Sequence, residues 1–275
     1  MRKYVLITCV LIAAALASAA AILRALRLPP ASGRILTDSS QDWASLPFND
    51  GICAVVNNTW NRAAAGKRLE QTVFIEEISG HPAVGWRWKA PWSLPPTVVS
   101  QPQVVCGNKP WDPKTRPDDG FPFPVGAKRV TADFDARLQA HGVYNMVFTL
   151  WAVSALPASR RNISHEIMIW TAAAWLSPAG RRVDSIAVNG VNYSVYVEPH
   201  QTDASGQNAN TWKYVAFVPA RAVLRGPLDL SVFLDYLLRR GEITGHHYLT
   251  SLEFGNEVSA GAGVVEISSF ALSVR

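Results

Sequence analysis

Glu166 is the first residue whose surroundings could do chemistry, because the stretch around it alternates like a β-strand. Period-two patterning over residues 164–170 turns Glu166, Met168 and Trp170 to one face and the intervening His and Ile residues to the other. This places a carboxylate among a thioether and an indole, on a face that is poorly suited to a hydrophobic core. We therefore expect Glu166, Met168 and Trp170 to face a ligand rather than the core.

A second carboxylate has similar surroundings near the C-terminus. In the stretch 252–257 the alternation puts Glu253, Gly255 and Glu257 on one face and Leu252 and Phe254 on the other. Two carboxylates on facing strands are what glycosidic bond cleavage requires, since one protonates the leaving oxygen while the other attacks or stabilises the sugar carbon. The pair Glu166 and Glu257 is the candidate catalytic dyad.

Three motifs carry a resemblance to a known family. The stretch HEIMIW (165–170) resembles the YEIMIW strand of glycoside hydrolase family 12, and SLEFGNEVSAGAGVVEISSFALSV (251–274) resembles its C-terminal strands. NNTW (57–60) is similar to the family's NNLWG. The likeness extends over most of residues 52–275.

The resemblance implies roles for particular residues. The glutamate of EIMIW is the nucleophile in that family and the glutamate of the last motif is the acid/base, which implies these roles for Glu166 and Glu257. Asn58 and Trp60 are two residues apart, so on a strand they would share a face, where an indole stacks on a sugar and an amide fixes a hydroxyl. By resemblance this pair forms a glycone-side subsite, and Trp111 extends the cleft.

One departure from the family pattern lies close to the chemistry. Thr149 stands where family members usually carry an Asp, and alternation along residues 145–151 places it beside Glu166. A threonine hydroxyl can only donate a hydrogen bond to a carboxylate, whereas a second carboxyl would repel it. We therefore expect Thr149 to contact the substrate side of the site and to keep Glu166 ionised to lower pH than an Asp at this position would.

Recurrent short alternating runs separated by Gly, Pro, Asn and Asp predict an all-β fold. The family resemblance implies a jelly-roll sandwich of two antiparallel sheets with one packed α-helix. The helix is expected in residues 227–241, where Leu230, Phe233, Leu234 and Leu237 form a helical stripe. A chain of 275 residues can bury the core of one such domain.

The N-terminus predicts export. Residues 1–20 have a basic start, an apolar run and small residues suited to cleavage, so they read as a signal peptide or an uncleaved signal anchor. Residues 21–42, with two prolines and no periodicity, are expected to be a linker, and 43–275 the catalytic domain. The protein is thus expected to be secreted or held outside the cytoplasm by a membrane tether.

The composition favours some partners over others. Charged residues are 17% and the net charge is +5, with no basic run interleaved with aromatics, so we expect no nucleic-acid partner. We expect a monomer that binds a β-glucan polysaccharide. No cysteine or histidine spacing suggests a metal, and the resemblance implies no cofactor.

Cys53 and Cys106 are an even pair that an oxidising compartment would allow to form a disulfide. Both lie in apolar strand-like surroundings, however, and cysteine is often buried unpaired. The sequence therefore favours two free, buried thiols over a bridge.

These observations predict a retaining endo-β-1,4-glucanase that hydrolyses cellulose-like or mixed-linkage β-glucan. Two alternatives stay open. The first is an endoglucanase specific for xyloglucan with the same mechanism. The second is a glucan-binding or host-recognised surface protein that has lost turnover through the change at Thr149.

Overall fold

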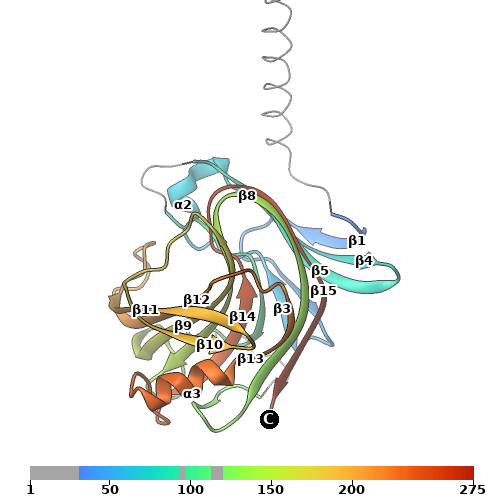
Figure 1. The fold of residues 1–275 in the computed structure, drawn as a ribbon. Coiled ribbons are helices and arrows are strands. Elements are labelled where there is room, and N and C mark those ends of the chain that lie inside the picture. The colour runs from blue at the N-terminus through green and yellow to red at the C-terminus, as the bar shows by residue number, and fades with distance from the viewer. Residues whose placement is uncertain (1–30, 93–96, 113–119) are drawn as a thin grey trace, which may run out of the picture.

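The computed structural model of the chain describes residues 31–92, 97–112 and 120–275, and within these ranges it is a two-layered β-sandwich (Figure 1). The predicted signal segment 1–20 lies outside the described residues. Within the described ranges no helix combines the length and the hydropathy needed to cross a bilayer. The predicted all-β jelly roll is confirmed.

The long strand β8 (Val130–Val153) joins the two layers, since its first part pairs with β15 and its last part with β14 and β9. The outer layer contains β1 (Arg34–Ser39), β4 (Glu70–Ile78), β5 (His81–Ala90), β15 (Val258–Val274), the first part of β8, and β13 (Arg225–Asp229). In Figure 1, β8 and β15 curve together along one side of the molecule.

The other layer, here called the cleft layer, carries the candidate dyad. Its strands are β2 (Ser45–Phe48), β3 (Cys53–Val56), β6 (Gln103–Gly107), β7 (Phe123–Pro124), β14 (Tyr248–Gly255), the last part of β8, β9 (Ile163–Ala174), β12 (Trp212–Pro219), β11 (Val191–Gln201) and β10 (Arg181–Val188). β9 and β12 are parallel and the other pairs are antiparallel.

Aromatic rings from both layers fill the core between them. Phe134, on the first part of β8, packs 5.1 Å from Phe148 on its last part, and Phe148 stacks 4.2 Å from Phe254 of β14. Ile167 of β9 joins the same core. The predicted alternation is thus observed on β9 and β14: the apolar residues face the core, and Glu166 and Glu253 point to the opposite face.

The predicted helix is α3 (Ser231–Arg239), and it packs on the core side of the cleft layer. Phe233 lies 4.9 Å from the ring of Phe217 on β12 and 5.0 Å from Tyr193 on β11. Leu230, Leu234 and Leu237 are buried with it. The described residues also form a short helix that the sequence did not indicate, α2 (Arg62–Ala65), and two 3₁₀ turns, η1 (Gly66–Arg68) and η2 (Arg160–Asn162).

Two sequence predictions on the N-terminal half are wrong. Residues 34–39, predicted as linker, form β1, which pairs with β4, so the folded domain begins before Trp43. Cys53 and Cys106 are joined by a disulfide, because the pairing of β3 with β6 sets them directly opposite at a Cα–Cα distance of 4.4 Å. Apolar surroundings suit a buried bridge as well as a free thiol.

The disulfide gives a stability prediction. Replacing both Cys53 and Cys106 by Ser should lower the free energy of unfolding by about 2–4 kcal/mol, since the bridge closes a loop across the denatured chain. Urea unfolding of the variant and of the oxidised wild type measures this difference. Equal midpoints would show that the bridge contributes nothing to stability.

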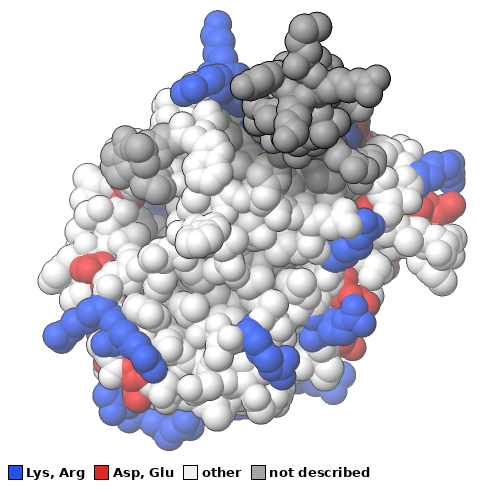
Figure 2. Space-filling model, turned by 45° about the horizontal axis from the view of Figure 1, so that its top comes forward, with Lys and Arg blue, Asp and Glu red and all other residues white. Residues whose placement is uncertain are grey.

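The charges on the face drawn in Figure 2 lie mostly toward its margin. Lys and Arg side chains surround a centre of uncharged residues. Such a distribution is typical of a solvated surface.

Candidate active site

A cleft of about 400 Å³ opens on the cleft layer, and both predicted catalytic residues line it. Its other lining residues include Asn58, Trp60 and Trp111, which the sequence also predicted. The remaining residues are Trp43, Thr97, Val98, Gln101, Trp151, Arg160, Ile163, Trp212 and seven residues of the stretch 201–208. Five of the eight predicted site residues are thus brought together.

Glu166 is fixed by the strands on either side of it. It pairs with Trp151 of β8 and with Tyr214 of β12, and its side chain is 9% exposed. Trp212 Nε1, at the start of β12, donates a hydrogen bond of 2.9 Å to Glu166 Oε2. An indole donor orients the carboxyl without adding a charge.

Glu257 lies in the turn between β14 and β15, and Asn145 of β8 holds it. The Glu257 backbone N–H donates to Asn145 Oδ1 at 2.9 Å, and Asn145 Nδ2 donates to Glu257 Oε2. The Asn145 backbone N–H also donates to the Glu257 carbonyl at 3.2 Å. Three contacts with one residue of β8 give this carboxyl a defined position in the cleft.

Burial raises the pKa of both carboxyls into the neutral range. The pKa of Glu166 is raised to about 8 by desolvation, with repulsion from Glu257 and Glu253 adding to it, while the Trp212 hydrogen bond opposes the shift. Desolvation raises the pKa of Glu257 to about 7, opposed by the Asn145 hydrogen bond. Because the two groups repel each other, they titrate as a pair that holds one proton between its two steps.

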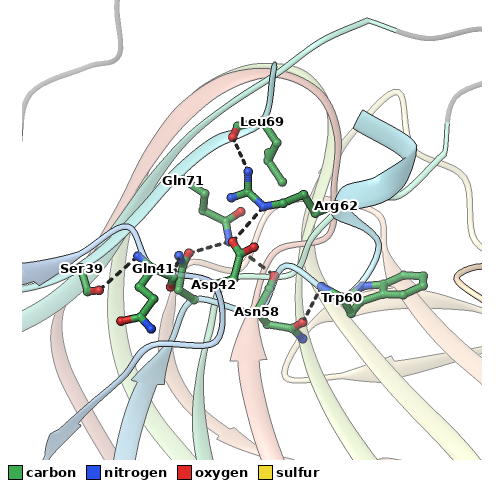
Figure 3. Close-up of polar contacts among 9 residues, drawn as sticks. Ser39, Gln41, Asp42, Asn58, Trp60, Arg62, Leu69 and Gln71 are labelled. Atoms are coloured by element: carbon green, nitrogen blue, oxygen red, sulfur yellow. Dashed lines mark hydrogen bonds and ion pairs between the residues drawn. The ribbon is translucent and has the colours of Figure 1, made fainter. Parts of the chain in front are cut away.

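Trp60 lies in a turn and not on a strand, so strand alternation does not explain why it lies close to Asn58. β3 ends at Val56, and Asn58 Oδ1 accepts a hydrogen bond of 3.1 Å from the Trp60 backbone N–H (Figure 3). Local side-chain to backbone bonds of this kind stabilise turns. The buried Asn58 amide therefore positions Trp60, which is half-buried in the cleft wall.

A polar network behind this turn ties it to β4. Gln71 Nε2 donates to Asn57 Oδ1 at 2.8 Å, and Asn57 Nδ2 donates to the Gln41 carbonyl at 2.8 Å. Arg62 forms an ion pair of 2.8 Å with Asp42 (Figure 3). The turn that presents Trp60 is thus braced on two sides.

The position of Trp60 leads to a binding prediction. Trp60→Ala should weaken binding of oligosaccharides that reach the glycone side by about 1 kcal/mol, the size of other aromatic contacts. Shorter ligands should lose less. Calorimetric titration with a series of oligosaccharides measures this, and Trp92→Ala, which changes an exposed tryptophan outside the lining set, is the matched control.

If Trp60→Ala lowers the melting temperature and leaves the affinity for long oligosaccharides unchanged, then Trp60 contributes to packing and not to binding.

Three tryptophans form a continuous wall that leads to Glu166. The rings of Trp111 and Trp151 lie 4.7 Å apart, and those of Trp151 and Trp212 lie 5.6 Å apart, both edge to face. Trp212 then donates to Glu166. The wall therefore combines sugar-stacking surface with the orientation of a carboxyl.

The connection between β11 and β12 forms another wall of the cleft. Gln207 Nε2 donates to the Trp60 carbonyl at 3.1 Å, and Arg160 donates to the Gln207 carbonyl at 3.0 Å. β3 and β12 belong to opposite ends of the cleft layer, so this contact joins its two ends. In Figure 1, α2, which follows Trp60, lies above β11 and β12.

Thr149, Met168 and Trp170 are fully buried and are not among the residues that line the cleft. Met168 and Trp170 are on the same side of β9 as Glu166, as predicted, but pack in a hydrophobic cluster with Tyr214. Alternation predicts which way a side chain points and not what covers it. Gln101 Nε2 donates to Thr149 Oγ1 at 3.4 Å.

The pH expectation attached to Thr149 compares this chain with one that carries Asp at that position, and it stays a prediction. In this chain the pKa of Glu166 is raised, chiefly by burial. Repulsion from Glu257 and from Glu253, which lies on β14 beyond β8, adds to this shift.

Sequence reasoning missed Trp212 and Asn145, the two residues that hold the carboxyls. Trp212 begins a run predicted as a strand, but nothing in the sequence indicates that this strand lies parallel beside β9. Strand alternation puts Asn145 on the same face as Thr149, and this pattern could have indicated that Asn145 lies near the carboxyls. In the described ranges no group of His, Cys, Asp and Glu side chains forms a metal-type cluster.

Comparison with known proteins gives consistent results. The sequence profile of glycosyl hydrolase family 12 matches residues 52–275. The chain is 25% identical to Endoglucanase S of Pectobacterium parmentieri over 86% of its own length and 87% of that protein. It is also 25% identical to Inactive glycoside hydrolase XLP1 of Phytophthora nicotianae, over 82% and 87% of the two chains.

A solved structure shares the fold closely. The family 12 xyloglucanase from Bacillus licheniformis superposes with a TM-score of 0.77 at 26% identity, covering 87% of this chain and all of that one. Fold and site together define a glycoside hydrolase with a carbohydrate cleft on a β-sandwich. The chain belongs to glycosyl hydrolase family 12.

Proposed function

We propose that the protein is a retaining endo-β-1,4-glucanase in which Glu166 is the nucleophile and Glu257 the acid/base. The observation that carries this proposal is the pair of buried carboxyls facing one tryptophan-lined cleft. Their raised pKa values provide one proton for the pair near neutral pH. Retaining hydrolysis needs one carboxylate and one carboxylic acid. Glu166, which has the higher pKa, holds the shared proton more often than Glu257 does, so the reaction proceeds from the less populated arrangement in which Glu257 carries the proton and Glu166 is ionised.

The reaction would proceed in two displacements. The Glu166 carboxylate attacks the anomeric carbon while the bond to the leaving oxygen breaks, and Glu257 gives its proton to that oxygen. Glu257 then removes a proton from water, whose oxygen attacks the same carbon and releases Glu166 from the glycosyl ester. Trp212 and Asn145 keep the two carboxyls in place during both steps.

An undecorated β-glucan is the proposed substrate. A sugar stacked on Trp60 would lie next to the Gln207 contact, where the 201–208 wall reaches the Trp60 carbonyl. A branch on that sugar would compete with this wall for space. Xyloglucan is the second candidate, supported by the structural similarity to the Bacillus licheniformis xyloglucanase.

Reducing-end assays of the purified protein on mixed-linkage glucan, carboxymethyl cellulose and xyloglucan test the proposal. Faster hydrolysis of an undecorated glucan supports it, and faster hydrolysis of xyloglucan favours the second candidate. If the protein hydrolyses none of the three, nor an aryl cellotrioside, a non-catalytic glucan-binding protein is favoured. The similarity to an inactive relative is consistent with that alternative.

The raised pKa values also predict the pH profile. Well below pH 7 both carboxyls are neutral and Glu166 cannot attack, while well above pH 8 both are ionised and no proton is available for the leaving oxygen. We expect kcat/KM to peak between neutral and mildly alkaline pH. Measurement on an aryl cellobioside from pH 4 to 10 tests this, and a maximum near pH 4.5 would contradict it.

A further inference from the structure

A buried ion pair lies beside the dyad and has no part in the proposed reaction. Lys109 Nζ is 3.1 Å from Glu253 Oε1, and the two side chains are only 6% and 1% exposed. Removing two charges from water is unfavourable, and their mutual attraction often does not compensate for it. A pair of this kind is therefore poorly explained by stability alone.

The strand register places Glu253 on the same face as the nucleophile. Glu253 of β14 lies directly opposite Thr149 of β8, and Thr149 lies opposite Met168 of β9, two residues from Glu166. Side chains two residues apart on a strand share a face, so Glu253 and Glu166 point to the same side of the cleft layer. Glu253 thus brings a carboxylate next to the position where Thr149 replaces the family's usual Asp.

The ion pair also contacts the tryptophan wall. Lys109 Nζ lies 5.1 Å from the centre of the Trp111 ring, in cation–π geometry. Burial raises the pKa of the Glu253 carboxyl, and Lys109 opposes that shift most strongly. The side-chain N–H groups of Gln103 and Trp151 also oppose it, although neither reaches ordinary hydrogen-bond geometry. Because Trp151 packs on Trp212, the pair is connected by contacts to the donor that holds Glu166.

We propose that Glu253, paired with Lys109, is a positioning residue that sets the pH range in which Glu166 is ionised and seats the tryptophan wall. The inference rests on the proposed function of Glu166. In this reading β14 supplies a carboxylate near the position where Thr149 replaces the family's usual Asp.

The charged and titratable groups around Glu166 determine in which direction its pKa changes when the charge of Glu253 is removed. Glu257 comes from the β14–β15 turn, Glu253 from β14, Lys109 from the segment after β6, and Tyr214, kept neutral by a pKa well above its ordinary value, from β12. Repulsion from Glu253 raises the pKa of Glu166, and attraction to Lys109 lowers it by less. Removing the Glu253 charge should therefore lower the pKa of Glu166.

The experiment compares three proteins: wild type, Glu253→Gln, and the double variant Lys109→Met with Glu253→Gln. The single variant leaves Lys109 unopposed, so its Glu166 should titrate at the lowest pH. The double variant removes both charges and should titrate between the single variant and wild type. It also keeps the test available if the single variant fails to fold, since a neutral pair leaves no uncompensated buried charge.

Two readouts follow the titration. The first is the acid limb of kcat/KM. The second is carbon NMR of ¹³C-glutamate-labelled protein, with the Glu166 carboxyl signal assigned by its loss in Glu166→Gln. The NMR titration needs no turnover, so a protein that hydrolyses no glucan would refute the proposed function and still test this inference.

Glu266→Gln is the matched control, because Glu266 is a 2% exposed glutamate paired with Arg137 at 2.7 Å in the outer layer. The Glu266→Gln variant should change stability and leave both the acid limb of kcat/KM and the NMR titration of Glu166 unchanged. The proposal is supported if the pH at which Glu166 titrates is highest in the wild type, intermediate in the double variant and lowest in the single variant. Coincident Glu166 titrations in the three proteins, or any other order, would overturn it.

Discussion

Glu166→Gln should abolish turnover while leaving the fold and glucan binding intact. The amide has nearly the same shape and can still meet the Trp212 side chain, but it cannot form a glycosyl ester. Loss of a covalent nucleophile lowers kcat by on the order of 10⁴- to 10⁶-fold in well-studied hydrolases. Steady-state assays on mixed-linkage glucan, with calorimetric binding of an oligosaccharide, measure both expectations.

Glu70→Gln is a suitable control, since Glu70 is an exposed glutamate of β4 whose partner is Lys89 and which does not line the cleft. It should keep wild-type activity. A Glu166→Gln protein that retains more than a small fraction of kcat would remove Glu166 from the mechanism.

Glu257→Ala should have an effect that depends on the leaving group. General acid catalysis contributes about 10²- to 10⁴-fold, and it matters least when the leaving group departs without a proton. Cleavage of polysaccharide should therefore fall by this range, while release of an activated phenol from an aryl cellobioside should fall much less. Parallel kcat/KM measurements on the two substrates provide the comparison.

Azide gives an independent check on Glu257. The small anion fits where the carboxyl was removed and attacks the glycosyl enzyme without needing a general base, so it should restore turnover of the aryl substrate and yield a β-glycosyl azide. Equal losses on both substrates, with no effect of azide, would assign Glu257 a different role.

Much of the fold could be predicted because strand alternation is a local property. Ile167 and Phe254 face the core and Glu166 and Glu253 face away from it, as period-two patterning requires. The helical stripe of α3 was equally readable. The sequence could not predict which strands are neighbours, and for that reason the pairing of Cys53 with Cys106 and of β9 with β12 was not foreseen.

The candidate site was predictable to the same extent. The positions of Glu166, Glu257 and Trp60 followed from local motifs, whereas the burial of Met168 and Trp170 depends on Tyr214, a residue of another strand. The pKa values of the two carboxyls could not be predicted from the sequence, because desolvation depends on the whole fold. The raised pKa of Glu166 therefore could not be predicted from the residues around it in the sequence.

Trapping of the covalent intermediate tests the central claim most directly. A 2-deoxy-2-fluoro-β-cellobioside with a good leaving group forms the glycosyl enzyme and slows its hydrolysis, so the label stays on the nucleophile. Peptide mass spectrometry after digestion should find one added fluorocellobiosyl group on Glu166. A label on a different residue, or no label on a protein that hydrolyses glucan, would contradict the assignment of Glu166 as the nucleophile of a retaining mechanism.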